Sequence, residues 1–418
     1  MTRILHFADA HIDMATQGRH DPATGLPVRS LDFLKSLDTI VDTAIDERVD
    51  LVIFAGDAYK DRTPVPTFQR EWGRRMIKLS RAGIQTLLLV GNHDLSPAAG
   101  RAHAMQEYET IPVPHVQVIS RPSFLGPDDL EGLPIQVAGL PWVSRSSLIA
   151  SLGMDGQEPG KIYQEIETRL VELVNVWLEE RRDPTLPVVL AAHASVHGAK
   201  YGAERCVMLG SDLVLPGSLV RDPRLNYTAL GHIHKPQDLN EGQQPPVIYP
   251  GSIERVDFGE SRDDKFFIIA DVQAGQPTKV EWRQLHGRRF IDLKKRFTSI
   301  EEIQFGLETC LPEPEILADA MVRLVLEYPA ALDPLVNEVE LRRRAETCFE
   351  FHLIRRPQRE ARLRLPEDST ISSLSAMELL DLYWNSASSD NGSEDPQELS
   401  ELQNLAKQVI ISVSGNMG

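Results

Sequence analysis

Residues 86–94 read Thr-Leu-Leu-Leu-Val-Gly-Asn-His-Asp and carry the most informative pattern of this chain. An apolar run of this length, bounded by turn residues, predicts a buried strand of a parallel sheet. The strand ends directly in Asn92, His93 and Asp94, whose side chains can bind metal ions or transfer protons. Four further apolar runs end in the same way, before Asp9-Ala10-His11, Gly56-Asp57, Ala192-His193-Ala194 and Gly231-His232-Ile233-His234.

These runs place metal-binding side chains at the carboxyl ends of five strands. Polar groups at such ends face one crevice of a parallel sheet. We therefore expect two Asp, one Asn and four His to converge there as ligands: Asp9, His11, Asp57, Asn92, His193, His232 and His234. That set is too large for one closed metal site and suits two ions that share a bridging carboxylate, for which Asp57 is the natural candidate. Carboxylate, carbonyl and imidazole ligands without thiolate favour a hard divalent ion such as Mn²⁺.

His93 and Asp94 follow Asn92 and predict a role other than metal binding. We expect His93 to donate a proton or to stabilise the transition state, and Asp94 to hold its ring. Each motif alone has a plainer interpretation, because Gly-Asn-His-Asp is a good turn and most Asp-x-His pairs are turn residues. The presence of all five motifs in this order, each at a strand end, favours the functional interpretation.

Composition and charge bound the class of protein. The 418 residues are 42% hydrophobic and 25% charged, as in ordinary globular proteins. The net charge of −17 argues against a generic nucleic-acid binder, yet residues 279–364 carry +1 and residues 365–418 carry −8. The three cysteines lack metal spacing and indicate a reducing compartment. We see neither a signal peptide nor an apolar stretch of about 18 residues, so we expect a cytoplasmic protein that does not span a membrane.

Two ranges have the patterns of folded domains. Residues 1–278 alternate strand and helix patterns, which predicts an α/β domain. Helices are expected from the apolar spacing around 33–45 and 162–177. Residues 279–365 predict a small α+β unit. Its arginines at 342–344 and 355–356 are either a solvated face or a contact to a DNA backbone.

Residues 366–418 predict a tail of two amphipathic helices. Apolar residues recur at helical spacing over 374–384 and again over 399–410, and the polar stretch 386–396 joins them. The apolar faces of these helices dock either on their own chain or in a groove of a partner.

The motifs together resemble the calcineurin-like metallophosphoesterases, and within them the SbcD branch of DNA-repair nucleases, the bacterial counterpart of the meiotic-recombination-eleven family. Segments 137–142, 229–237 and 249–260 carry the likeness to the nuclease branch. The resemblance implies a layered α/β fold: a β-sandwich core flanked by helices, then a capping domain at 279–365 and partner-binding helices at 366–418. It also implies one metal held by Asp9, His11, Asp57 and His234, a second held by Asp57, Asn92, His193 and His232, and a catalytic His93 supported by Asp94.

The resemblance further implies an activity and partners. The chain would be the nuclease subunit of an SbcC–SbcD type complex, cutting DNA with two Mn²⁺ (Mg²⁺ being possible) as a 3′-to-5′ exonuclease on duplex ends and an endonuclease near hairpins or single strands. Its partner would be SbcC, an ABC-type ATPase with a long coiled coil. Homodimerisation would use helices near 65–82 and 97–108. The alternatives are a phosphoesterase of small molecules or phosphoproteins, and a scaffold of the same fold without catalysis.

Two residues depart from the family pattern. Asp13 stands where the Asp-x-His motif usually continues with Gly, and Lys60 stands where many members have His or an acidic residue. Neither departure removes a ligand. Both leave open how the substrate is positioned.

Overall fold

A computed structural model of the whole chain describes residues 1–14, 18–95, 101–143, 159–202 and 213–358, and residues 375, 377, 378, 380 and 405 of the tail. Contacts divide the chain into two compact units. The first unit comprises Met1–Asp292 with Glu315–Arg323 and Thr347–Glu350. The second comprises Leu293–Pro314, Leu324–Glu346 and the chain from Phe351 onward.

The first unit contains two six-stranded mixed sheets. One has the order β14-β13-β1-β2-β3-β4, in which β1 to β4 run parallel and β13 and β14 are antiparallel additions. Its strands are β1 (Thr2–Phe7), β2 (Leu51–Phe54), β3 (Gln85–Leu89), β4 (Val116–Ile119), β13 (Lys265–Val272) and β14 (Lys279–Leu285).

The other sheet has the order β11-β12-β10-β7-β6-β5. Its four central strands run parallel, and the strand at each edge is antiparallel to its neighbour. Its strands are β5 (Ser123–Leu125), β6 (Gln136–Leu140), β7 (Val188–His193), β10 (Tyr227–Gly231), β11 (Gln237–Asp238) and β12 (Val247–Tyr249). A short parallel pair, β8 (Ser195–Val196) and β9 (Val214–Leu215), lies outside both sheets.

All five motif strands are present, but they divide between the two sheets. The strands β1, β2 and β3 belong to one sheet, and β7 and β10 belong to the other. The apolar pattern alone suggested one parallel sheet, which is wrong, whereas the two mixed sheets flanked by helices agree with the layered α/β fold that the family resemblance implied. A strand that is buried on both faces has the same apolar run in either arrangement, so the pattern of apolar residues could not distinguish them.

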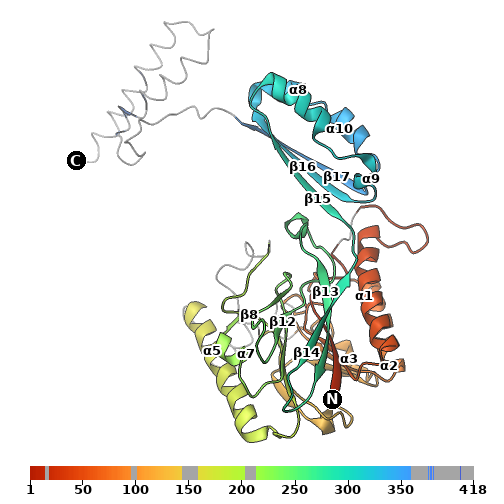
Figure 1. Cartoon of the computed structure of the whole chain (residues 1–418), viewed down its shortest axis with the longest axis vertical. Helices are drawn as coiled ribbons and strands as arrows, with labels where there is room; N and C mark the ends of the chain where they lie inside the picture. Colours follow the sequence, from red (N-terminus) through yellow and green to blue (C-terminus); the bar gives the residue numbers. More distant parts are fainter. Residues whose placement is uncertain are drawn as a thin grey trace. The chain divides into compact units, whose positions relative to one another are not determined.

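Helices cover the outer faces of the two sheets. Figure 1 shows α1 (Val28–Asp46) and α5 (Pro159–Val176) on opposite sides of the first unit. Both helices were expected from the apolar spacing around 33–45 and 162–177, and the structure confirms them. α2 (Pro66–Arg81) accompanies α1, and α7 (Gly217–Val220) lies on the side of α5. Short helical turns complete the unit: α3 (Glu107–Thr110), Pro127–Asp129, Trp177–Arg181, Phe258–Glu260 and α9 (Pro314–Leu317).

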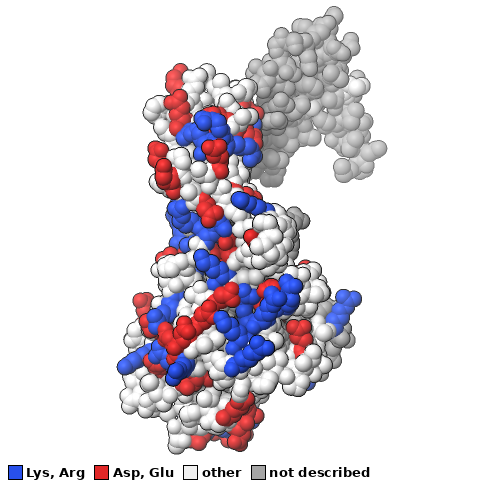
Figure 2. All heavy atoms as spheres, turned by 90° about the vertical axis from the view of Figure 1, so that its right-hand side faces the viewer, with Lys and Arg blue, Asp and Glu red and all other residues white. Residues whose placement is uncertain are grey.

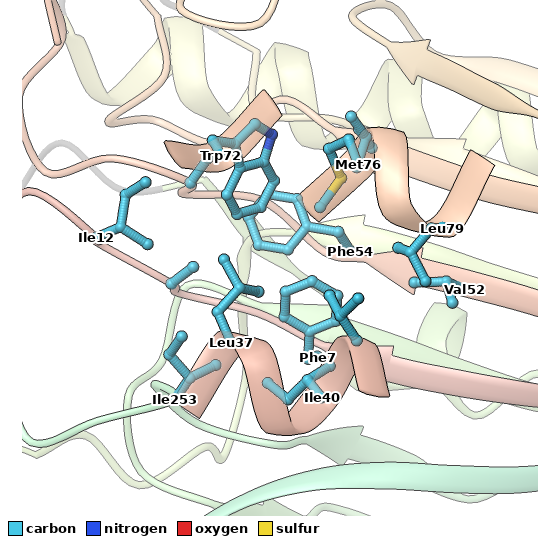
Figure 3. Close-up of a cluster of buried hydrophobic side chains, with 14 of the residues drawn as sticks. Phe7, Ile12, Leu37, Ile40, Val52, Phe54, Trp72, Met76, Leu79 and Ile253 are labelled. Atoms are coloured by element: carbon cyan, nitrogen blue, oxygen red, sulfur yellow. The ribbon is translucent and has the colours of Figure 1, made fainter. Parts of the chain in front are cut away.

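Three buried clusters stabilise the layers. One joins the first sheet to α1 and α2, where Phe54 packs against Phe7 at 4.9 Å and against Trp72 at 4.8 Å between ring centroids (Figure 3). A second joins the other sheet to α5 and α7. The third contains side chains of both sheets, including Ile53 and Ala191, and is the sandwich interior. Burial of this much apolar surface fixes the two sheets face to face.

The second unit is built on a three-stranded sheet with the order β15-β16-β17. Its strands are β15 (Phe290–Arg296), β16 (Met321–Pro329) and β17 (Glu350–Gln358), and its helices are α8 (Ile300–Thr309), α10 (Glu338–Arg344) and the turn Ala330–Leu335. The side chain of Ser299 caps α8, and the side chain of Asn337 caps α10. Figure 1 shows α8 and α10 on the same side of the sheet.

The change of unit falls later than the boundary expected at residue 278. Lys279–Leu285 forms β14, which pairs with β13 over seven residue pairs. The turn at 273–278 therefore joins two strands of one sheet. The predicted helices at 374–384 and 399–410 lie outside the described residues, apart from isolated positions. None of the described helices is long and apolar enough to cross a membrane.

The molecular surface mixes charges of both signs. On the face that Figure 2 shows, Lys and Arg interleave with Asp and Glu. Ion pairs also join α1 to α2, among them Arg75 with Asp38 at 2.7 Å. Global net charge is therefore a poor guide to local binding.

Candidate dimetal site

One group of ligand side chains comes from the loops after β1 and β10. A carboxylate oxygen of Asp9 and ring nitrogens of His11 and His234 lie within 4.8 Å of one another. The Nε2 atoms of the two histidines are 3.1 Å apart. Nδ1 of His11 faces the Tyr59 carbonyl at 3.2 Å, and Nδ1 of His234 faces a Glu260 carboxylate oxygen at 2.9 Å. Because these oxygens accept, each Nδ1 carries a proton and each Nε2 presents its lone pair to the shared space.

A second group combines Asp57 after β2, His193 at the end of β7 and His232 after β10. The side-chain oxygen of Asn92, after β3, lies 3.0 Å from Nε2 of His193 and 2.9 Å from Nδ1 of His232. Nδ1 of His193 donates to the carbonyl of Ala55 at 2.6 Å, which turns Nε2 toward the group. All seven predicted ligands therefore meet in two adjacent groups, and their assignment as ligands stays a prediction.

Asp57 lies between the two groups. Its Oδ2 atom is 3.4 Å from Nε2 of His193 and 3.9 Å from Nε2 of His11, one histidine from each group. Its Oδ1 atom accepts a hydrogen bond from the backbone N–H of His93 at 2.8 Å. Burial opposes ionisation of Asp57, but the three neighbouring histidines outweigh it and hold its pKa well below the usual range. A bridging carboxylate requires this position and this charge.

The donor set fits two divalent cations. Asp9 is 0% exposed and Asp57 is 1% exposed. Within the described ranges, neither carboxylate forms an ion pair with Lys or Arg. Buried anions need compensation. Burial opposes a charge on His193, but the facing Asp57 carboxylate raises the pKa of His193 to about 9, so a protonated His193 compensates Asp57 in the metal-free chain. Bound cations would replace that proton, because metals bind the neutral imidazole. Burial lowers the pKa of His11 to about 3, which keeps this ligand in the neutral form that metals bind.

The backbone at the site is strained. Eight described residues other than glycine have positive φ, and four of them are predicted ligands: Asp9 (50°), His11 (38°), Asp57 (66°) and His232 (101°). Glycines allow the close approach of the motif loops. A Cβ on Gly91 would lie 2.1 Å from Oδ1 of Asp57, and one on Gly56 would lie 2.3 Å from Nδ1 of His193. Strain of this kind persists where the surroundings hold a functional geometry.

His93 lies at the edge of the site, half-buried, with its ring centroid 5.2 Å from that of His11. Its Nδ1 donates to the carbonyl of Lys60 at 2.8 Å. The expectation that Asp94 holds this ring is therefore wrong. The Asp94 carboxylate lies under the motif loops and accepts backbone N–H groups of Asp57, Ala58 and Gly91 at 2.8–3.0 Å. Burial, with the nearby Asp57, raises the pKa of Asp94 to about 7.

Some groups at the site have no signal in the motifs. Glu260, which orients His234, also accepts from the buried ammonium of Lys265 at 2.6 Å and from Ser252 at 3.2 Å. The ring of Trp142 packs on His232 at 4.9 Å. Both residues lie in the segments that carry the family resemblance, which was the available signal, but their contacts depend on the fold. The carbonyl of Lys60 could not have been found, because a backbone group leaves no trace in residue identity.

Comparison with known proteins agrees with this geometry. Residues 2–236, more than half of the chain, match the family described as calcineurin-like phosphoesterase. The SbcD subunit of the SbcCD nuclease of Rhodobacter capsulatus is 28% identical over 353 residues, covering 80% of this chain and 79% of the relative. The corresponding protein of Escherichia coli K12 is 25% identical and covers 67% of each chain. The DNA double-strand break repair protein Mre11 of Archaeoglobus fulgidus is 24% identical and covers 71% of this chain and 65% of its own.

The fold and the site define a metallophosphoesterase with an intact set of dimetal-site residues. The chain belongs to the calcineurin-like phosphoesterase family, and its relatives include SbcD nuclease subunits.

Proposed function

We propose that this chain is an Mn²⁺-dependent DNA nuclease, the nuclease subunit of an SbcC–SbcD type complex. One observation carries the proposal: similarity to proteins named as nuclease subunits extends over 353 residues, well beyond the 2–236 range of the family match. The two ligand groups that share Asp57, with His93 beside them, supply the chemistry that phosphodiester cleavage needs.

The side chains have separate roles in this proposal. Two bound ions would activate a water molecule and neutralise charge on the phosphate. The lone pairs of the imidazole nitrogens and the carboxylates of Asp9 and Asp57 would hold them. With Nδ1 of His93 donating to the Lys60 carbonyl, Nε2 would first take up a proton from solvent and then, from the imidazolium form, deliver that proton to the departing oxygen. Asp94 would act indirectly, by tying the Gly91 turn to the Asp57 loop.

The proposal includes a substrate and partners. The substrate would be DNA, cut 3′-to-5′ at duplex ends and endonucleolytically near hairpins or single strands. The partner would be an SbcC-type ATPase that controls entry of DNA, the chain would form a homodimer, and the complex would act in the cytoplasm in break processing, repair and recombination. The capping domain expected at 279–365 would contact DNA. The predicted helices within 366–418 would bind the ATPase, so a chain lacking 366–418 should keep its metals and fail to copurify with it.

A nuclease assay tests the proposal. The purified chain is incubated with linear duplex and hairpin DNA, with Mn²⁺ or Mg²⁺, with and without the ATPase. Cutting of DNA that requires a divalent metal is the expected result. Hydrolysis of nucleotide monoesters without any cutting of DNA would instead indicate a small-molecule phosphoesterase. Failure to bind metal would indicate a scaffold without catalysis.

A further inference from the structure

The turn at Tyr59 and Lys60 orients two histidines of the site, one a predicted metal ligand and the other the predicted proton donor. The carbonyl of Tyr59 accepts from Nδ1 of His11, a predicted metal ligand, at 3.2 Å. The carbonyl of the next residue, Lys60, accepts from Nδ1 of His93, the predicted proton donor, at 2.8 Å. Two consecutive peptide groups therefore fix which nitrogen of each ring faces the reaction space. Their effect depends on the turn being held in place.

The loop after β1 holds this turn. Backbone hydrogen bonds run between the two loops, from the N–H of Asp9 to Gly56 at 3.0 Å and from that of Ile12 to Ala58 at 3.1 Å. Beyond Ile12 the connection continues through a side chain. The carboxylate of Asp13 accepts the N–H of Lys60 at 2.5 Å through one oxygen and the N–H of Asp61 at 3.1 Å through the other.

The burial of Asp13 leaves the N–H groups of Lys60 and Asp61 with few alternative acceptors. Asp13 is only 4% exposed, so water does not readily replace it as the acceptor. The side chain of the preceding residue, Tyr59, is fully buried against Trp72, with ring centroids 6.1 Å apart. The turn is thus fixed by the Asp13 hydrogen bonds and by the buried Tyr59 side chain. A Gly, which the family pattern has at position 13, offers no acceptor for the two N–H groups.

We propose that Asp13 is a positioning residue for His93. By accepting from the N–H groups of Lys60 and Asp61, it fixes the Lys60 carbonyl and, through that carbonyl, the tautomer and orientation of the His93 ring. The inference rests on the proposed function in one respect, the role of His93 as the proton donor. Its geometric part, from Asp13 to the His93 ring, stands without it.

Loss of Asp13 should act mainly on the chemical step. Without its acceptors, the Lys60 peptide can rotate, and Nδ1 of His93 loses its partner. The ring then samples both neutral tautomers, and only the Nδ1–H tautomer leaves the lone pair of Nε2 free to take up the proton that the ring later delivers. A misplacement of about 1 Å at a reacting group can cost on the order of 10²-fold in rate.

The test uses Asp13→Gly and Asp13→Asn in the full chain. The matched control is Asp183→Gly, because Asp183 also accepts N–H and hydroxyl groups of a turn, at Thr185, outside the motifs. Cleavage of a duplex oligonucleotide with Mn²⁺ is measured, because its alkoxide leaving group needs a proton, together with Mn²⁺ content. For Asp13→Gly we expect kcat to fall about 10- to 100-fold with KM and metal content unchanged. Asp13→Asn, which keeps one acceptor oxygen, should recover part of kcat, and Asp183→Gly should match the parent chain.

A second measurement, of the His93 tautomer, does not depend on enzymatic activity. In metal-free protein labelled with ¹⁵N-histidine, the His93 ring should show a single Nδ1–H tautomer, and Asp13→Gly should convert it to a mixture. Amide exchange of Lys60 and Asp61 should accelerate in the same variant. An unchanged His93 tautomer in both Asp13 variants would overturn the inference, as would a fall in kcat explained by lost metal. If no substrate is hydrolysed by the parent chain, the proposed function fails, and the tautomer measurement still decides the inference about Asp13.

Discussion

Two ion pairs of this molecule have the same length and very different surroundings. Near the candidate dimetal site, Lys265 and Glu260 are 2.6 Å apart, and their side chains are 0% and 3% exposed. In the three-stranded sheet, Arg323 and Asp292 are also 2.6 Å apart, with side chains 31% and 34% exposed. The carboxylate of the buried pair has further fixed partners, because Glu260 also accepts from His234, from Ser252 and from the N–H of Val256. Burial, rather than distance, therefore decides which region responds strongly to substitution.

The largest loss of metal is expected from substitution of Asp57, whose buried carboxylate lies between the two ligand groups. Asp57→Ala should remove more metal than Asp9→Ala or His193→Ala, because a bridging carboxylate serves two ions and the others serve one. Metal analysis of the three variants, purified in parallel, makes the comparison. Two tightly bound ions in Asp57→Ala would refute the bridging assignment.

His93 separates metal binding from catalysis within the same region. His93→Ala should lower kcat by about 10²- to 10⁴-fold, because the proposed proton transfer is lost. Metal content should be unchanged, because Nδ1 of His93 faces the Lys60 carbonyl and its ring lies outside both ligand groups. The control is His115→Ala, which removes a partly exposed histidine paired with Glu131. Loss of metal from His93→Ala would make His93 a ligand.

Glu260→Gln tests the buried ion pair itself. The variant leaves Lys265 buried without a countercharge, which should lower the free energy of unfolding by about 3–5 kcal/mol. It also weakens the orientation of His234, which should reduce metal affinity by about 10- to 100-fold. Thermal melting and calorimetric titration with Mn²⁺ measure the two effects. Adding Lys265→Met should restore much of the stability without restoring the affinity, whereas recovery of both would show that Glu260 acts only through the fold.

The smallest effect is expected on the three-stranded sheet. Asp292→Asn breaks a pair of the same length, yet the free energy of unfolding should change by only about 0–1 kcal/mol, because water solvates the freed arginine. Urea denaturation compares this variant with Glu260→Gln. A loss as large as that of the buried pair would show that exposure does not control the response.

The same contrast explains what the sequence could predict. The candidate ligands were identifiable because they directly follow the ends of buried strands, so that Asp57 and His232 stand beside apolar runs. The pattern of apolar residues could not divide the five strands between two sheets, because burial on both faces produces the same pattern in either case, and only the family resemblance implied a sandwich. The role of Asp94 was mistaken for a related reason. Its neighbour in sequence is His93, but its partners are backbone groups of loops brought together by the fold.

The groups that orient the ligands were also beyond the sequence. Glu260 is 26 residues from His234, and the Lys60 carbonyl is 33 residues from His93. Contacts of this kind depend on loop conformations that residue spacing does not specify. Asp13 was visible as a departure from the family pattern. Its contact with the N–H of Lys60, 47 residues away in sequence, depends on the fold.

The central claim is that Asp57 joins two metal ions into one site. Titration of the metal-free chain with Mn²⁺, followed by electron paramagnetic resonance, tests it most directly. We predict two ions per chain with an exchange-coupled spectrum, because a shared carboxylate holds the ions about 3.5–4 Å apart. One ion per chain, or two ions with independent spectra, would contradict the account.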